Sequence, residues 1–198
     1  IARRFVSQLH AAIPGHVDPE TITEGIRRLR EQKTRHLETD PQVIDVKEGR
    51  GGIRDIEFLV QGLQLLYVTS PKAEVEGSAP SGACVEADEL EGNTLRAIEC
   101  LRRSGILDGD TARTLHDDYV FLRKTEHVLQ VAADRQVHSL RLDADDTGLI
   151  ARRMQQAQGM REDFWTRLKD TLKRAHTLYQ EQLLKRHSDG PPAESEDM

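Results

Sequence analysis

Apolar residues recur every three or four positions along much of the chain, and this spacing restricts the fold more than any other feature. Such a period places side chains on one face of an α-helix. The clearest stripes are formed by Ile22, Ile26 and Leu29, by Ile56, Leu59, Val60, Leu63, Leu66 and Tyr67, by Leu95, Ile98 and Leu101, by Leu115, Tyr119, Leu122 and Leu129, and by Trp165, Leu168, Leu172, Ala175, Tyr179 and Leu183. Aromatic residues make up only 4% of the sequence, which suits amphipathic helices better than strands. The chain is therefore predicted to be mainly helical.

Capping residues indicate where these helices begin and end. Asn93 or Thr94 and Asp108 or Asp110 are candidate N-caps, and Gly105 is a candidate left-handed stop. The predicted helices cover about 19–37, 53–68, 94–104, 110–133, 149–156 and 160–185.

Consecutive amphipathic helices joined by short turns pack antiparallel, so the predicted fold class is all-α. We expect an up-and-down helical bundle with an N-terminal helical extension and a short extended segment, since residues 43–47 alternate apolar and polar. The expected divisions are 1–52 as the end of a preceding domain or a connection, 53–187 as the bundle, 69–92 within it as a flexible insertion rich in Ser, Pro, Gly and Glu, and 188–198 as a disordered tail.

Charge and composition exclude several classes of protein. A net charge of -6 and a pI near 5.8 argue against nucleic-acid binding, which relies on clustered Lys and Arg. No apolar run approaches the roughly 18 residues of a membrane span. Cys84 and Cys100 have no metal-ligand spacing, and the sequence begins at Ile1 rather than at methionine. We expect a cytoplasmic piece of a longer protein that holds no metal of its own. Six histidines without a partner at ligand spacing are predicted to lie on the surface: His10, His16, His36, His116, His176 and His187.

A glycine-rich turn leads into the helix predicted at 53–68. Gly51 and Gly52 would let backbone amides approach a ligand, and the helix N-terminus favours an anion. Lys47, Arg50 and Arg54 could add full positive charges that meet phosphate oxygens. The pattern is neither the dinucleotide fingerprint nor the phosphate loop. The alternative is a tight turn with surface charges.

Two polar stripes run beside the apolar ones on separate helices. They consist of Arg54, Glu57, Gln61 and Gln64, and of Arg123, Glu126, His127 and Gln130. The stripes could face each other or a catalytic domain, and the alternative is an interhelical salt-bridge network. A basic set on the first long helix is predicted to be a solvated face or an interdomain contact: Arg27, Arg28, Arg30, Lys33 and Arg35.

These residues resemble a known family. Residues 45–64, with a Lys, a Gly-x-Gly-Gly-Ile-Arg core and an acid-Ile-Glu-Phe sequence, are similar to the hallmark of glutamine-synthetase adenylyltransferases. Residues 93–95, 105–107, 119–130 and 134–138 also resemble that family's helical domain, in the same order. Glu48 stands where an apolar residue is more usual, and an acid there is similar to the related PII uridylyltransferases.

The resemblance implies a parent enzyme that transfers AMP from ATP to a tyrosine of glutamine synthetase, or removes it by phosphorolysis. It implies Mg²⁺ held by acids of an upstream nucleotidyltransferase domain, so this chain alone has no complete catalytic centre. Glutamine synthetase and the PII signalling protein are the implied partners. The paired acids at 108–110 and 143–145 are interpreted as loop and cap residues.

Three functions remain open at this point. Lys47, Arg50, Arg54 and Glu57 could lie at the rim of a nucleotide site built mainly upstream. The bundle could instead be a module that docks glutamine synthetase or PII, with the glycine turn as a hinge. It could also be a structural spacer. Whether the parent adds or removes AMP, or transfers UMP, is not decided by these motifs.

Overall fold

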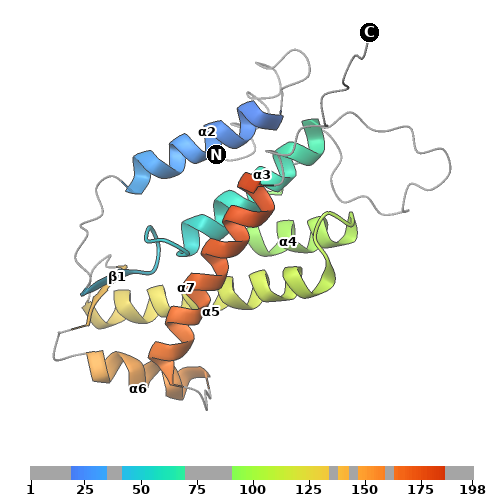
Figure 1. Ribbon diagram of the computed structural model, residues 1–198. Helices are drawn as coiled ribbons and strands as arrows, with labels where there is room; N and C mark the ends of the chain where they lie inside the picture. The colour runs from blue at the N-terminus through green and yellow to red at the C-terminus, as the bar shows by residue number, and fades with distance from the viewer. Residues whose placement is uncertain are drawn as a thin grey trace, which may run out of the picture.

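The chain folds into a helical bundle with one small sheet (Figure 1), and the predicted all-α class is confirmed. The computed structural model describes residues 19–34, 42–69, 91–133, 138–142, 147–158 and 163–185. Its elements are α2 (Pro19–Thr34), β1 (Val43–Asp45), α3 (Ile53–Thr69), α4 (Thr94–Arg103), α5 (Gly109–Ala133), β2 (Ser139–Arg141), α6 (Thr147–Gln158), α7 (Phe164–Tyr179) and the π-helical turn η1 (Gln180–Lys185). The predicted N-terminal helical extension, most of the 69–92 insertion, the acids at 143–145 and the tail lie outside the described residues.

Helix α3 is the centre of the bundle. It packs against α2, α4, α5 and α7, and α7 crosses it diagonally in Figure 1. Its predicted apolar stripe is buried from Ile56 to Leu66, whereas Tyr67 is partly exposed. Leu183 and Ile26 pack closely against α3 at Gly62, because a Cβ there would lie 2.6 Å from Leu183 and 2.8 Å from Ile26.

Three of the predicted helix-capping residues are confirmed. Asn93 accepts a hydrogen bond from the amide of Arg96 (3.1 Å), and Asp108 accepts one from the amide of Thr111 (2.8 Å). Gly105 has φ +71° and ends α4, as predicted. Local capping therefore sets these boundaries.

One expectation about burial is wrong, and one fully buried residue lies outside the predicted stripes. Leu29, predicted to face inward, is 53% exposed, whereas Arg30 is buried in its place. The buried face of α2 continues from Ile26 to Arg30 because α3 presents a carboxylate there, as described below. Phe164 was left out of the predicted stripe on α7, yet it is fully buried and packs edge-on against Trp165.

The segment between the predicted helices at 110–133 and 149–156 contains a strand. β2 pairs antiparallel with β1, and Ile44 is opposite Leu140. The alternation that predicted β1 covers five residues, 43–47, whereas β2 offers only three, so its pairing with β1 identifies it. The amide of Val46 then bonds to the carbonyl of His138 at 2.9 Å, which extends the pairing to the start of the glycine turn.

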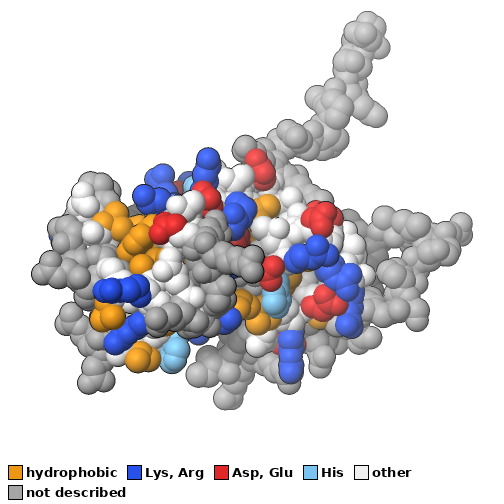
Figure 2. All heavy atoms as spheres, turned by 90° about the horizontal axis from the view of Figure 1, so that it is seen from below, with side chains coloured by type: hydrophobic (Ala, Val, Ile, Leu, Met, Phe, Trp, Pro, Cys, Tyr) orange, Lys and Arg blue, Asp and Glu red, His pale blue; other side chains and the backbone are white. Residues whose placement is uncertain are grey.

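The surface carries charges of both signs. Figure 2 shows Lys and Arg side chains interspersed with Asp and Glu on the face seen from below. Arg27 and Arg28 of α2 pair with Glu24 on their own helix and are exposed in this chain, which fits both a solvated face and an interdomain contact. None of the described helices is long and apolar enough to cross a membrane.

Candidate functional site

The glycine turn lies between β1 and α3 and is held by its own backbone. Asp45, the last residue of β1, accepts hydrogen bonds at Oδ1 from the amides of Lys47 (2.9 Å) and Glu48 (2.7 Å). The amide of Gly49 bonds to the carbonyl of Asp45 at 3.1 Å. These bonds bend the chain sharply between the strand and the helix.

Both predicted glycines of the turn are buried. Gly51 has φ +73°, and a Cβ on it would overlap the carbonyl of Leu172 on α7. A Cβ on Gly52 would lie 2.8 Å from the carbonyls of Val46 and Lys47. Close packing against α7 and the turn itself therefore requires glycine at both positions.

The amides of this turn already have acceptors. Those of Gly52, Ile53 and Arg54 bond to backbone carbonyls of the turn at 3.0 Å each. The amide of Gly51 bonds to Oδ2 of Asp55 at 2.6 Å. What the turn can offer a ligand is therefore its side chains rather than the amide cradle expected from the glycines.

Asp55 is the centre of a buried charge cluster, here called the inner cluster, formed by Arg30, Asp55 and His176. Its carboxylate is 0% exposed, and Oδ1 accepts a hydrogen bond from Arg30 Nε. Arg30 Nη2 also donates to the carbonyl of Gly49 (3.0 Å), and His176 Nδ1 lies 3.2 Å from Asp55 Oδ2. One carboxylate thus ties α2, the turn and α7 together.

The inner cluster was missed by sequence reasoning. Arg30 was grouped with a basic face, and His176 was predicted to lie on the surface, whereas its side chain is only 30% exposed and lies beside the Asp55 carboxylate. Arg30 and His176 are 25 and 121 residues from Asp55 along the chain. No local spacing could have linked them. The sequence feature that could have indicated this cluster is Asp55, an acid within the predicted motif.

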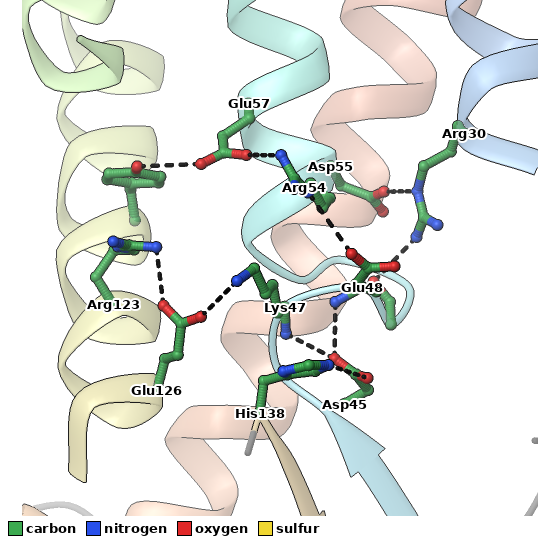
Figure 3. A network of polar contacts seen from close by, with 12 residues as sticks. Arg30, Asp45, Lys47, Glu48, Arg54, Asp55, Glu57, Arg123, Glu126 and His138 are labelled. Atoms are coloured by element: carbon green, nitrogen blue, oxygen red, sulfur yellow. Dashed lines mark hydrogen bonds and ion pairs between the residues drawn. The ribbon is translucent and has the colours of Figure 1, made fainter. Parts of the chain in front are cut away.

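A second cluster, here called the outer cluster, joins the two predicted polar stripes (Figure 3). It consists of Lys47, Arg54, Glu57, Tyr119, Arg123 and Glu126. Lys47 Nζ lies 3.1 Å from Glu126 Oε1, and Arg123 Nη1 donates to Glu126 Oε2 at 2.8 Å. The carboxylate of Glu126 therefore has a cation on each side.

Glu57 is the second acceptor of the outer cluster. Arg54 Nη1 donates to its Oε2 at 2.9 Å, and the hydroxyl of Tyr119 donates to its Oε1 at 3.3 Å. Arg54 Nε also lies 3.8 Å from Oε1 of Glu48. Burial is the largest influence on Tyr119 and raises the pKa of its phenol. Glu57 and Tyr119 therefore link α3 to α5, although Tyr119 belongs to the predicted apolar stripe of α5 and not to its polar one.

The cations of the outer cluster reach solvent, whereas Arg30 and Asp55 of the inner cluster are 8% and 0% exposed. The side chains of Lys47 and Arg54 are 28% and 39% exposed, while their partners Glu126 and Glu57 are 5% and 18% exposed. Buried carboxylates thus hold cations that still reach solvent. Such fixed cations suit an anionic ligand better than freely rotating surface lysines.

The other predicted site residues are spread around this cluster. Arg50 is exposed and forms no ion pair with any residue the structure describes. His127 is exposed, and Gln130 is half-buried. Gln64 is buried and accepts a hydrogen bond from the amide of Glu91 (2.9 Å), so it serves the chain leading into α4. Across the described ranges, no group of three or more His, Cys, Asp or Glu could hold a metal ion.

Comparison with known proteins identifies the class to which this helical domain belongs. The family model described as GlnD PII-uridylyltransferase matches residues 24–183, and the chain belongs to this family.

Curated relatives are bifunctional glutamine synthetase adenylyltransferase/adenylyl-removing enzymes. The one from Xanthomonas axonopodis pv. citri is 32% identical over 152 residues, which is 77% of this chain and 14% of that enzyme. Those from Aromatoleum aromaticum (36% over 129 residues) and Hahella chejuensis (31% over 128 residues) each match 65% of this chain. The chain spans only 12% of each of these two relatives. The predicted resemblance is confirmed.

Proposed function

We propose that this chain is the helical domain beside the nucleotidyltransferase domain of a glutamine synthetase adenylyltransferase. The parent enzyme would transfer AMP from ATP to a tyrosine of glutamine synthetase or remove it by phosphorolysis. The observation that supports this most is the outer cluster, where Lys47 and Arg54 reach solvent from a rigid turn. The activity and the substrate are those for which the relatives are named.

The outer cluster suits phosphate because its cations are oriented before a ligand arrives. Lys47 and Arg54 come from the two sides of a turn whose amides are all internally bonded at 51–54. Cations that need no reorganisation stabilise charge that develops during phosphoryl or nucleotidyl transfer. Arg50, exposed on the same turn, adds a third positive charge. These side chains would contact the phosphates of ATP.

ATP and Mg²⁺ are proposed for the whole enzyme. The cationic outer cluster fits the phosphate end of the nucleotide, and its carboxylates already hold Lys and Arg. The carboxylates that bind Mg²⁺ are proposed to come from the upstream domain, where the metal would neutralise charge on the transferred phosphate.

The test is Arg54→Ala in the full-length enzyme. Transfer of AMP from ATP to glutamine synthetase should fall by about a hundredfold, as on removal of one preorganised donor. Arg102→Ala is the matched control, since Arg102 is exposed on α4 and pairs with Glu99 of its own helix. An Arg54→Ala rate equal to that of the control would remove the outer cluster from the mechanism.

A docking module is the second candidate, and the closed pairing within the outer cluster favours it. If the cations serve only to join α3 and α5, then the bundle surface rather than the turn would meet glutamine synthetase or PII. Calorimetric titration of the 198-residue chain with each protein separates the two proposals. Docking is favoured if the chain binds either protein in the titration and the Arg54→Ala enzyme keeps its activity. The absence of binding to both proteins contradicts docking.

The nucleotide transferred is a further open choice within this proposal. Glu48 is an acid, as in the uridylyltransferases, and it lies against Arg54 rather than free in solvent. Glu48→Leu should therefore remove one of the two carboxylates beside Arg54 and leave its hydrogen bond to Glu57. ATP and UTP supplied to the full-length enzyme, with glutamine synthetase and PII as acceptors, identify the reaction directly.

A further inference from the structure

A pocket of about 640 Å³ opens on the side of α5 that continues from the outer cluster. Its described lining comes from the start of α4, the middle of α5 and one residue of α6. The lining residues are Asn93, Thr94, Leu95, Tyr119, Val120, Arg123, Lys124, His127, Val128 and Met154. The size is that of a small-molecule site.

The charge of this pocket is opposite to that of the whole protein. Arg123, Lys124 and His127 are basic side chains, and no Asp or Glu is among the described residues that line it. The chain as a whole has a net charge of -6. An anion is therefore the ligand that this pocket would attract.

The floor of the pocket is apolar. Leu95 of α4 and Val120 and Val128 of α5 are half-buried, and Met154 of α6 is fully buried beneath them. An inorganic ion would leave this floor unused. A ligand with a flat apolar body and one anionic group would cover the floor and still reach the cations.

Arg123 is held at the boundary between the pocket and the outer cluster. Its Nη1 donates to Glu126, whose carboxylate is 5% exposed, while about half of the Arg123 side chain stays accessible. The guanidinium has five N–H donors, so this one bond leaves others for a ligand. Glu126 thereby acts as a positioning residue for the pocket.

We propose that this pocket binds a small aromatic monophosphate, with the ring on the apolar floor and the phosphate at Arg123, Lys124 and His127. A nucleoside monophosphate is the source that agrees with the proposed function. The proposal rests on that function only for this choice of source.

The test is calorimetric titration of the 198-residue chain with AMP, UMP, phenyl phosphate, adenosine and inorganic phosphate. The three aromatic monophosphates should bind, and each should bind at least about tenfold more tightly than adenosine or phosphate alone, because both halves of the pocket contribute. Preference among AMP, UMP and phenyl phosphate identifies the source. Phosphate binding as tightly as AMP would overturn the role of the floor, and silence of all five probes would overturn the site.

Variants locate the binding. Lys124→Glu should weaken AMP binding by about tenfold or more through charge reversal, whereas Lys173→Gln, an exposed change on α7 outside the described lining, should leave it unchanged. Val128→Trp should fill the pocket and block binding. If Val128→Trp does not fold, the Lys124→Glu comparison still decides. Binding unaffected by Lys124→Glu overturns the proposal.

The outcome is separate from that for the proposed function. AMP binding that Lys124→Glu weakens would support the pocket even if Arg54→Ala left transfer unchanged. A large Arg54→Ala effect without AMP binding would support the enzyme and overturn the pocket.

Discussion

Residues 54–57 at the start of α3 contribute to both clusters. Asp55 belongs to the inner cluster, whereas Arg54 and Glu57 belong to the outer one, and the two sets have different surroundings. Asp55 points toward α2 and α7 and is 0% exposed, whereas Glu57, two residues on, points toward α5 and holds the accessible Arg54. Figure 3 shows the two acids on different sides of the helix. Within one turn of α3, the charged motif therefore supplies one carboxylate that stabilises the fold, Asp55, and one that positions a candidate ligand-binding residue, Glu57.

This difference shows how to interpret a charged motif. Both clusters consist of a carboxylate with basic partners, so residue type does not separate them. Removal of one partner from a fully buried pair leaves an uncompensated charge in a poorly solvated place, and the fold loses stability. Removal of one partner from a partly exposed pair lets water replace it, so any large effect must come from a ligand.

The largest effect is expected at the turn above the inner cluster. Gly51→Ala should lower the free energy of unfolding by about 3 kcal/mol or more, because a Cβ at φ +73° would overlap the Leu172 carbonyl. Gly105→Ala is the matched control, since φ is +71° there but nothing lies within 4 Å of the added Cβ. It should cost about 1 kcal/mol. Urea denaturation measures both, and equal losses would show that α7 does not pack on the turn.

Asp55→Asn should also destabilise strongly. Loss of the carboxylate leaves the Arg30 guanidinium buried without a counter-charge, at a cost of about 3 kcal/mol. Glu57→Gln, the same change two residues away, should cost about 1 kcal/mol or less because its partner Arg54 is 39% exposed. Urea denaturation measures the free energy of unfolding of both variants. Similar decreases would contradict the proposed difference between the two clusters.

Lys47→Met tests whether a cation of the outer cluster serves a ligand rather than the fold. The free energy of unfolding should change by only about 1 kcal/mol, because Lys47 is 28% exposed and Arg123 remains with Glu126. Transfer by the full-length enzyme should nevertheless fall by about tenfold or more if Lys47 contacts the nucleotide phosphates. Equal loss of stability and activity would mean that Lys47 only supports the fold.

The smallest effect is expected for Tyr179→Phe near the inner cluster. The Tyr179 hydroxyl is buried and has no hydrogen-bond partner among the described residues, so its removal should be nearly neutral at pH 7. Burial, followed by the charge of Asp55, raises the pKa of Tyr179 to about 12 from 10.0.

The pH dependence of that variant follows from the raised pKa. A folded-state pKa above the unfolded value means that stability is present below pH 10 and is lost as the pH rises from about 10 to 12. Tyr179→Phe should reduce this alkaline loss. Thermal unfolding at several pH values in this window measures it, and identical pH curves for wild type and variant would contradict the assignment.

Much of the fold could be predicted because its signals are local. The apolar period placed α3, α5 and α7 within a few residues of their bounds, and Asn93, Gly105 and Asp108 marked helix ends. The β2 strand and the inward turn of Arg30 could not be predicted in this way. Both depend on partners that lie far away along the chain.

The candidate site divides in the same manner. The sequence by itself determined that Arg54 and Glu57 share a polar face of one helix and that Arg123 and Glu126 share a polar face of another, because a helical period is set by the backbone. Tertiary packing alone decided that Lys47 reaches Glu126, that Tyr119 reaches Glu57, and that Asp55 is closed off by Arg30 and His176. The physical reason is that burial of a charge depends on every element around it, and no local spacing carries that information.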